Sequence, residues 1–258
     1  MAAADAHPQW ITPAWPAPAN VRALITTRAG GVSVGPFGAG GLDGGLNLGL
    51  KSGDDRGAVL ANRACLRAVL PAEAQWLHQV HGAAVAVLDE PAADAWADAA
   101  ISLRPGRVCV VSIADCLPVL FADSGGRAVG VAHAGWRGLA AGVLQNTAAA
   151  MRSALGETDA ALLAYLGPAI GPSHFEVGAE VLDAMSERLP RARDAFAPLA
   201  AGKYLCDLFA LARQALGCSG IEQIFGGGDC TYSDAARFYS YRRDRITGRH
   251  AAMIWLDS

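Results

Sequence analysis

The amino-acid sequence predicts one α/β domain. Short apolar runs rich in Val, Ile and Ala, typical of buried strands, alternate with longer amphipathic stretches typical of helices. Apolar residues make up 52% of the 258 residues and charged residues 17%, so the chain can bury a large interior. No linker or internal repeat divides it. We therefore expect a loose arm rich in Ala and Pro over residues 1–20, followed by a single domain over residues 21–258.

The first part of the domain is expected to hold a strand, a loop and a helix. Residues 21–27 form a short β-prone run, and a glycine-rich flexible loop follows it as far as Asn47. Apolar positions at helical spacing, with acids in front of them, predict a helix over residues 54–69. Residues 76–88 have strand character. The acidic stretch 90–100 is predicted to be a turn and a short exposed segment.

The centre of the chain holds three apolar runs, each predicted to be a buried strand: residues 108–114, 117–122 and 128–133. If Ser124 and Gly125 form a two-residue hairpin loop, Cys116 lies directly opposite His133 in the ladder. Directly opposed residues have Cβ atoms about 4.5 to 5.5 Å apart on one face of a sheet. The hairpin therefore predicts that a thiolate and an imidazole can share one metal ion.

The last part of the chain continues the alternation. The expected elements are a helix over residues 139–155, a strand over 161–166, helices over 179–189 and 204–216, a strand over 221–225 and a closing hairpin turning at Thr247-Gly248. The first of these helices begins just after His133. Its N-terminal N–H groups would favour an anion beside that residue.

The bulk properties exclude several classes of protein. A net charge of −3 and a pI near 6.0, without a run of basic residues, indicate that nucleic acid is not a partner. The N-terminal residues lack the basic and apolar regions of a secretory signal, and no apolar segment is long enough to span a membrane. We expect a cytoplasmic protein. The six cysteines show no CxxC spacing, which argues against a disulfide framework and against a four-thiolate zinc site.

The strongest candidate site combines His81, Cys116 and His133. Two imidazoles and a thiolate suit Zn²⁺ and leave a fourth position open, although copper accepts the same ligands. On spacing alone the histidine at His78 competes with His81. Cys116 could also be a plain core thiol, or a nucleophile activated by His133 with Asp115 or another acid orienting the imidazole.

Three further residues are candidates for holding an anion or a sugar. These are Arg28, which precedes a Gly-Gly turn, Asn47, and Arg137, which lies in a Gly-Trp-Arg-Gly turn. A guanidinium in such a turn can bind phosphate through two parallel N–H groups. An ordinary surface arginine is the competing interpretation for both cations.

Eight sequence motifs along the chain resemble those of one protein family and occur in the same order: TTRAGGVS, LNLG, QVHG, SIADCLPVLFAD, AHAGWRGLAAGV, LGPAIGPSHFEVG, CTYSD and FYSYRRDRITGR. Over residues 21–256 the chain resembles the laccase-domain proteins. These are also called YfiH-like multicopper polyphenol oxidoreductases, or purine nucleoside phosphorylases of that family. The resemblance implies a single-domain α/β/α sandwich with a mixed sheet.

The resemblance also implies a zinc ion held by His81 of QVHG, Cys116 of ADC and His133 of HAGWRG. Arg28 and Asn47 match pocket positions of the family. The implied partners are phosphate and the nucleosides adenosine, inosine, guanosine and S-methyl-5'-thioadenosine. The implied activities are their phosphorolysis and the hydrolytic deamination of adenosine. We expect a monomer or a weak homodimer.

Two other activities compete with the phosphorylase hypothesis. A copper-dependent phenol oxidase would need many more His and Cys ligands in HxH patterns, and this chain has six histidines and no HxH. An amidase acting on UDP-linked cell-wall precursors would use Cys116 and His133 for hydrolysis, with or without zinc.

Overall fold

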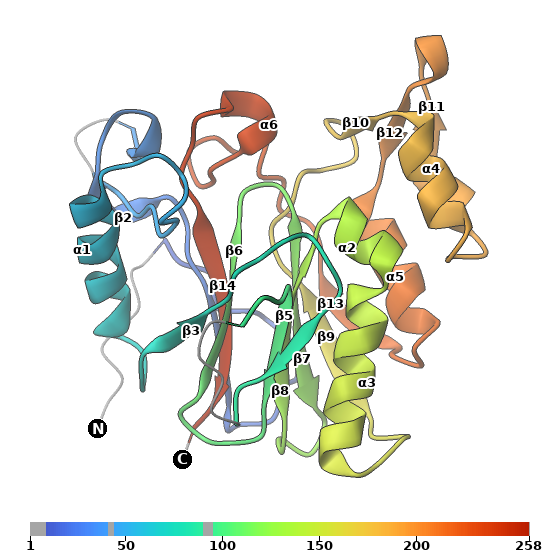
Figure 1. Ribbon diagram of the computed structural model, residues 1–258, viewed down its shortest axis with the longest axis horizontal. Coiled ribbons are helices and arrows are strands. Elements are labelled where there is room, and N and C mark those ends of the chain that lie inside the picture. The colour runs from blue at the N-terminus through green and yellow to red at the C-terminus, as the bar shows by residue number, and fades with distance from the viewer. Residues whose placement is uncertain (1–8, 41–43, 90–94, 258) are drawn as a thin grey trace.

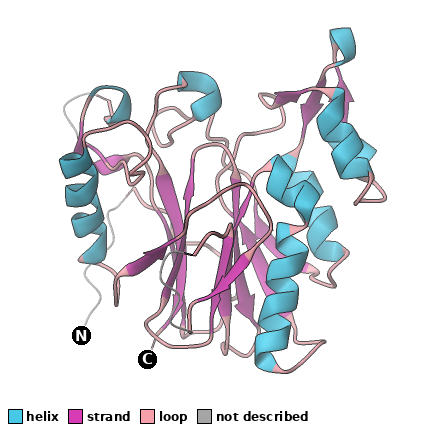
Figure 2. Cartoon of the chain, viewed as in Figure 1, coloured by secondary structure: helices cyan, strands magenta, loops and turns pink. Residues whose placement is uncertain are grey.

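The protein is described by a computed structural model over residues 9–40, 44–89 and 95–257, which form four layers (Figures 1 and 2). A single helix, two facing β-sheets and a group of helices follow one another across the molecule. This confirms the predicted α/β class with mixed sheets. The strands are divided between two stacked sheets, each covered by helix on its outer face.

The first sheet has four strands in the order β1, β14, β6, β3. Strand β14 pairs antiparallel with β1 and β6, and β3 pairs parallel with β6. Their bounds are β1 Val21–Ile25, β14 His250–Leu256, β6 Val108–Ile113 and β3 Ala74–Trp76. The first and last strands of the domain are therefore neighbours in one sheet.

The second sheet has six strands in the order β13, β9, β7, β8, β5, β4. Strand β7 lies antiparallel between β9 and β8, and the two edge strands pair parallel with their neighbours. The bounds are β13 Gln223–Gly226, β9 Leu162–Leu166, β7 Leu117–Asp123, β8 Val129–Ala134, β5 Ala99–Ser102 and β4 Val85–Val87. The three central runs named from the sequence are thus confirmed as strands β6, β7 and β8.

Helices cover the outer faces of both sheets (Figure 1). Helix α1 (Arg56–Arg67) covers the four-stranded sheet and is capped by Asp55, whose carboxylate accepts the Ala58 N–H at 2.8 Å. The six-stranded sheet is covered by α2 (Trp136–Ala141), α3 (Val143–Leu155) and α5 (Leu208–Gly217).

The remaining elements are short. A small sheet of β10 (Glu176–Val177), β12 (Tyr204–Cys206) and β11 (Phe196–Pro198) lies with α4 (Ala179–Ser186) at one end of the molecule. Strand β2 (Ala29–Ser33) follows β1, and α6 (Tyr241–Asp244) precedes β14. Three 3₁₀ turns cover Gly35–Phe37, Ala192–Ala195 and Ala200–Gly202.

The largest apolar layers lie on the two faces of the six-stranded sheet. Between the sheets, Val111 and Ile254 pack with Val131, and all three are fully buried. On the outer face, strand residues such as Phe121 pack with Leu144 of α3. Each such side chain stabilises the fold by about 1.5 to 3 kcal/mol through burial alone.

The N-terminal arm lies against the domain where it is described. Ile11 forms a β-bridge with Ile25, and the ring of Trp15 meets the edge of Tyr165 at a centroid distance of 5.9 Å. In the described residues, no helix is long and apolar enough to cross a bilayer.

Several predicted elements are wrong in detail because glycine or local pairing ends them. The helix expected over 139–155 is broken at Gly142, whose φ of 90° ends α2 and starts α3. The helix expected over 204–216 begins only after Asp207, since residues 204–206 pair as a strand. The closing hairpin is instead α6 followed by the single strand β14, which pairs with β1 and β6.

The prediction of a strand over residues 76–88 is also wrong for its middle. Strand β3 ends at Trp76 in the first sheet, and β4 begins at Val85 in the second. The residues between them form a loop that crosses from one sheet to the other. The connection from β6 to β7, residues 114–116, makes the same crossing. Both crossings carry candidate site residues.

Candidate functional site

Three side chains that are distant in the sequence converge where the two crossings meet the end of β8. One ligand atom from each of His81, Cys116 and His133 lies within 4.8 Å of the others. The imidazole rings of His81 and His133 meet edge to face, with centroids 4.8 Å apart. Zn–N and Zn–S bonds are about 2.0 and 2.3 Å long, so the three donor atoms lie close enough together to be candidate ligands of one ion.

The three candidate ligands differ in exposure. His133 is buried, Cys116 is half-buried and His81 is exposed to solvent. The group is therefore closed on the side of the sheet and open on the side of the crossing loop. An open side is the feature that distinguishes a catalytic metal site from a purely structural one.

The loop that carries His81 is held by hydrogen bonds to two strands. Gln79 exchanges two bonds with the Ser112 backbone, at 2.8 and 3.0 Å, and so extends the pairing of β3 with β6. Asp98 accepts the N–H groups of Val80, His81 and Gly82 at 2.7 to 3.1 Å. His81 has a φ of 62°, an uncommon conformation for a residue with a side chain. This conformation is therefore fixed by the Asp98 carboxylate.

Asp98 also orients His133. Its Oδ1 lies 2.8 Å from Nδ1 of His133, and both side chains are buried. Burial favours the neutral acid, but the hydrogen bonds from His133, Gly82 and Val80 hold the pKa of Asp98 below its usual range. An ionised carboxylate only accepts, so Nδ1 carries the proton and Nε2 is left to bind a metal.

Sequence reasoning missed Asp98, because the acidic stretch 90–100 was expected to be exposed. Residues 90–94 lie outside the described residues, and Asp98 is fully buried in front of β5. One signal was available: an acid placed directly before the apolar run of residues 99–101. That placement favours a buried, paired carboxylate at the end of a strand.

The electrostatic environment of Cys116 favours the thiolate. Burial alone would raise the pKa of the thiol, but the charge and hydrogen bonds of His133 and His81 outweigh it and lower the pKa to about 6. Burial likewise would lower the pKa of His133, but the thiolate and Asp98 raise it to about 9. The thiolate is the form of cysteine that binds metals and attacks electrophiles.

The predicted hairpin register is wrong by two residues. His133 pairs with Pro118, not with Cys116, and the Asp123 N–H donates to the Ala128 carbonyl at 2.9 Å. The loop is longer because the Asp123 carboxylate also binds the backbone and guanidinium of Arg127. A shift of two residues keeps every side chain on its original face. Cys116 therefore stays beside His133, as a diagonal neighbour.

Asp115 occupies a different role from the one expected. Its φ is 88°, and its two carboxylate oxygens accept the Thr231 hydroxyl and the Arg242 N–H, both at 2.6 Å. The acid that orients His133 is Asp98. Asp115 instead ties the crossing that carries Cys116 to the segment before β14, and so positions the cysteine.

A cavity of about 660 Å³ adjoins the candidate ligands. It is lined by His81, Cys116 and His133, and by four cations from different parts of the chain: Lys51, Arg63, Arg242 and Arg249. Aromatic side chains of Trp76, Trp136, Phe175 and Tyr241 also line it. Among the described residues that line the cavity, the acidic one is Asp115, and both of its carboxylate oxygens already accept hydrogen bonds within the protein. The cavity therefore suits a ligand with an aromatic part and a negative charge.

The three polar candidates from the sequence lie outside this lining. Arg28 donates from Nε and Nη2 to the Gly38 carbonyl and from Nη1 to the Ala235 carbonyl, which occupies its guanidinium. Asn47 is fully buried, with its amide nitrogen on Ser52 and Asp54 and its oxygen on two backbone N–H groups. Arg137 is exposed and stacks on Trp136 at 4.4 Å.

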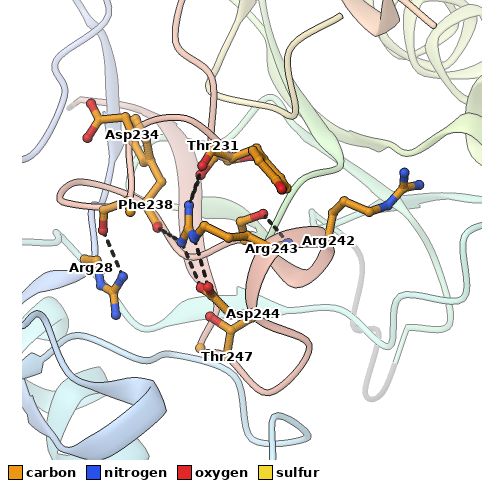
Figure 3. Close-up of polar contacts among 12 residues, drawn as sticks. Arg28, Thr231, Asp234, Phe238, Arg242, Arg243, Asp244 and Thr247 are labelled. Atoms are coloured by element: carbon orange, nitrogen blue, oxygen red, sulfur yellow. Dashed lines mark hydrogen bonds and ion pairs between the residues drawn. The ribbon is translucent and has the colours of Figure 1, made fainter. Parts of the chain in front are cut away.

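The segment before β14 is stabilised by one arginine (Figure 3). Arg243 donates to the carbonyl groups of Thr231, Tyr232 and Phe238 at 2.8 to 3.0 Å and pairs with Asp244 at 2.8 Å. Figure 3 shows the neighbouring Arg242 side chain pointing away from this cluster. The two arginines therefore differ in role: Arg243 holds the backbone, and Arg242 lines the cavity.

The fold and the His/Cys/His group define a class of mixed α/β protein in which three candidate metal ligands meet where the chain crosses between two sheets. The sequence matches the family of the multi-copper polyphenol oxidoreductase laccases over residues 22–257, and the chain belongs to that family. This confirms the resemblance seen in the sequence motifs.

Individual relatives cover nearly the whole chain. A protein of Pseudomonas aeruginosa named purine nucleoside phosphorylase is 51% identical over 96% of this chain and 98% of its own. The purine nucleoside phosphorylase YfiH of Escherichia coli is 49% identical over 95% and 98%. The crystal structure of a Neisseria meningitidis protein, NMB0706, superposes with a TM-score of 0.87 at 46% identity, covering 97% of this chain and all of the other.

Proposed function

We propose that this protein is a metal-dependent purine nucleoside phosphorylase. The observation that carries the proposal is the convergence of His81, Cys116 and His133 on a cavity lined by aromatic and cationic side chains. Two relatives at 49 and 51% identity bear the name purine nucleoside phosphorylase, which supports the same reaction. The products would be a free purine base and ribose 1-phosphate.

Zinc is the metal we propose for the three ligands. The chemistry of the donors fits it: a thiolate from Cys116, and an imidazole of His133 that is oriented through its other nitrogen by Asp98. When bound, the ion would supply a Lewis acid with one open coordination position. Copper accepts the same donors, and metal analysis of protein prepared without added copper distinguishes the two.

The chain's own residues would bind and orient the substrates. The rings of Trp76, Trp136 and Phe175 offer apolar surface to a purine, and the cationic lining residues offer N–H donors to phosphate. Departure of the base needs a proton on a ring nitrogen, and His78 also lines the cavity. Asp115 acts by positioning the Cys116 crossing.

The proposed substrates are adenosine, inosine, guanosine and S-methyl-5'-thioadenosine. We also propose that the same site deaminates adenosine to inosine, because an open Lewis-acid position next to a purine cavity suits attack of water on the carbon that bears the amino group. The two reactions differ in the co-substrate, phosphate or water, and compete for one nucleoside.

An assay of purified, zinc-loaded protein with adenosine tests both reactions. With phosphate present we expect adenine, inosine, hypoxanthine and ribose 1-phosphate, because inosine is itself a proposed substrate of phosphorolysis. Without phosphate we expect inosine alone. The matched control is the Cys116→Ala variant, which keeps the cavity and loses one ligand. Product formation no higher than in this control would rule out the proposed function.

Amide hydrolysis on a UDP-linked cell-wall precursor is a second candidate, favoured by one observation. Cys116, His133 and Asp98 form a thiolate, imidazolium and carboxylate series of the kind that activates a nucleophile. This chemistry needs no metal. Activity on an amide substrate that survives a chelator but is lost in Cys116→Ala would support it.

Oxidation of phenols by copper has weaker support. The family description names copper, but the described residues hold a single His/Cys cluster of three ligands. Multicopper oxidation needs several copper ions in one protein. Phenol oxidation by copper-free protein, or its absence from copper-loaded protein, would exclude this activity.

A further inference from the structure

The oxyanion partner of this site is not at the arginines that the sequence pointed to. Arg28 uses its guanidinium on two backbone carbonyls, and Arg137 stacks on the ring of Trp136. Neither lines the cavity beside the metal ligands. The charge on that cavity comes instead from the four lining cations named above.

Three of these four cations are less suited to grip an anion next to Cys116. Arg63 lies 3.7 Å above the ring of Trp76 and directs Nε and Nη2 to the Leu48 carbonyl. Arg242 lies over Phe175 at 5.2 Å and directs Nη1 to the Glu176 carbonyl. Lys51 lies 5.8 Å from the ring of Trp96, on an exposed turn.

Arg242 leaves Nε and Nη2 without a hydrogen bond to any described residue, as Arg249 does. Arg249 differs from Arg242 because two carbonyl groups hold its Nη1 and because it lies within electrostatic reach of Cys116. Nη1 donates to the carbonyl groups of Thr247 and Gly248, both at 2.9 Å, which fixes one side of the planar group. Neither Nε nor Nη2 has a hydrogen bond to any residue that the structure describes. These two nitrogens form one edge of the guanidinium, the edge that matches two oxygens of a phosphate.

The position of Arg249 is fixed along its whole length. Its backbone N–H donates to Asn47 Oδ1 at 2.8 Å, and its carbonyl accepts the Leu48 N–H at 2.9 Å. Its side-chain stem packs on Gly49, where an added Cβ would come within 2.7 Å of Cγ. Little conformational freedom is left to lose when an anion binds. This also explains Asn47, which acts by holding Arg249.

Arg249 is half-buried and lies within electrostatic reach of Cys116 and Asp115. Burial dominates its environment and disfavours its charge. A bound anion would replace the lost hydration, so the positive charge of Arg249 is better stabilised with an anion bound than without one.

We propose that Arg249 is the oxyanion-binding residue of this cavity, using Nε–H and Nη2–H to hold two oxygens of inorganic phosphate beside the His81, Cys116 and His133 group. The inference rests on the proposed function for its choice of phosphate as co-substrate. Arg242 and Lys51 add charge to the cavity without fixing the anion.

The first test compares phosphate kinetics of Arg249→Gln with those of Arg137→Gln. Loss of a charge-assisted pair should raise the KM for phosphate at least about tenfold in Arg249→Gln. The KM for the nucleoside should change less than about twofold. Arg137→Gln removes an arginine that stacks on Trp136 but does not line the cavity, and should match the wild type. Equal phosphate KM values in the two variants would overturn the proposal.

A second variant separates charge from geometry. Arg249→Lys keeps the positive charge and loses the two-pronged edge, so we expect a phosphate KM between those of the wild type and Arg249→Gln. Zinc content and thermal unfolding of each variant show whether the fold and the metal site are intact. If Arg249→Gln does not fold, Arg249→Lys alone carries the comparison, and a phosphate KM equal to that of the wild type would count against the proposal.

Direct titration makes this inference independent of turnover. Inorganic phosphate is titrated calorimetrically into zinc-loaded protein without nucleoside, for the wild type and both Arg249 variants. We expect binding to the wild type and loss of it in Arg249→Gln. If the wild type makes no ribose phosphate but binds phosphate through Arg249, the proposed function fails and the anion site stands. If the wild type makes ribose phosphate and Arg249→Gln binds phosphate equally well, the anion site fails.

Discussion

The carboxylate of Asp98 and the imidazole of His133 form a buried pair, with Oδ1 and Nδ1 2.8 Å apart. The same carboxylate accepts three backbone N–H groups from residues 80–82. One side chain therefore orients His133 directly and fixes the loop that presents His81. Two of the three candidate ligands depend on it.

Replacing Asp98 by Asn should weaken zinc binding more than it weakens the fold. An amide offers one acceptor oxygen and cannot pair with a charged imidazole, so we expect a loss of about 10- to 100-fold in metal affinity. Competition with a chromophoric chelator measures it. The matched control is Asp123→Asn, which removes a buried carboxylate paired with Arg127 in the hairpin loop. That variant should lose stability and keep its zinc affinity. Equal zinc affinity in Asp98→Asn and the wild type would show that the pair does not position the site.

Gly135 leaves room for the Cys116 sulfur. A Cβ at this position would lie 2.7 Å from Cys116 Sγ and 3.5 Å from His81 Cδ2, although the backbone φ of −66° suits any residue. Gly135→Ala should therefore displace the Cys116 sulfur and reduce zinc affinity by at least about tenfold, while the free energy of unfolding changes by about 1 kcal/mol or less. The control is Gly217→Ala, where a Cβ meets nothing within 4 Å. A zinc affinity of Gly135→Ala equal to that of the wild type would contradict the close contact.

Zinc affinity should rise with pH across the neutral range. His133, with its pKa raised to about 9, must release a proton before it can bind the ion, whereas the Cys116 pKa of about 6 leaves a thiolate above that value. Apparent affinity should therefore increase about tenfold per pH unit between pH 6 and 9, and more steeply below pH 6, where the thiol also competes. Chelator competition at several pH values measures the slope. Asp98→Asn lacks a carboxylate that raises the His133 pKa, so its apparent zinc affinity should stop rising at a lower pH than that of the wild type. A flat profile would exclude the thiolate and imidazolium pair.

His250 should make the fold acid-sensitive. It is fully buried beside Phe238 and Tyr239, and burial, with smaller contributions from Arg249 and Arg28, lowers its pKa to about 3. In the unfolded chain His250 binds a proton near pH 6.5, whereas in the folded chain it stays neutral until about pH 3. The free energy of unfolding therefore falls as the pH drops from 6.5 towards 3. The slope from this residue is at most about 1.4 kcal/mol per pH unit.

His250→Leu tests this contribution to acid sensitivity. Denaturant unfolding at pH 7 and pH 5 should show a smaller difference for the variant than for the wild type. The control, His174→Leu, removes a histidine that stacks on Tyr232 nearer the surface, and should keep the wild-type difference. An unchanged difference in His250→Leu would mean that other groups cause the acid sensitivity.

The central hairpin and the proximity of Cys116 and His133 could be predicted because the relevant signals are local, whereas His81 was preferred to His78 only through the family resemblance. The runs that became β6, β7 and β8 are apolar and β-branched, and Cys116 and His133 flank a short turn. Even the wrong register kept both side chains on one face, since the error was two residues. The α/β class followed from the same alternation of elements.

The rest depended on contacts between segments far apart in sequence. Asp98 meets His133 across 35 residues, and Asn47 meets Arg249 across 202, which no local pattern records. The division of the strands into two sheets is equally hidden, because a strand buried between sheets and one buried under helices have the same composition. Arg28 and Arg137 were predicted to be anion sites because the sequence does not show that backbone carbonyls occupy the first guanidinium and that the second stacks on Trp136.

Both β-crossings at this site pass from the four-stranded to the six-stranded sheet, so the distance between His81, Cys116 and His133 is set by how the sheets stack. Val111→Ala would leave a cavity between the sheets, although Val111 is not a candidate ligand. The sheets would then shift relative to each other, and the site would lose its geometry with all three ligands still present. If the three residues hold a metal, its loss would therefore indicate a loosened interior as readily as a missing ligand. A bound ion would in return act as a cross-link between the two halves of the fold.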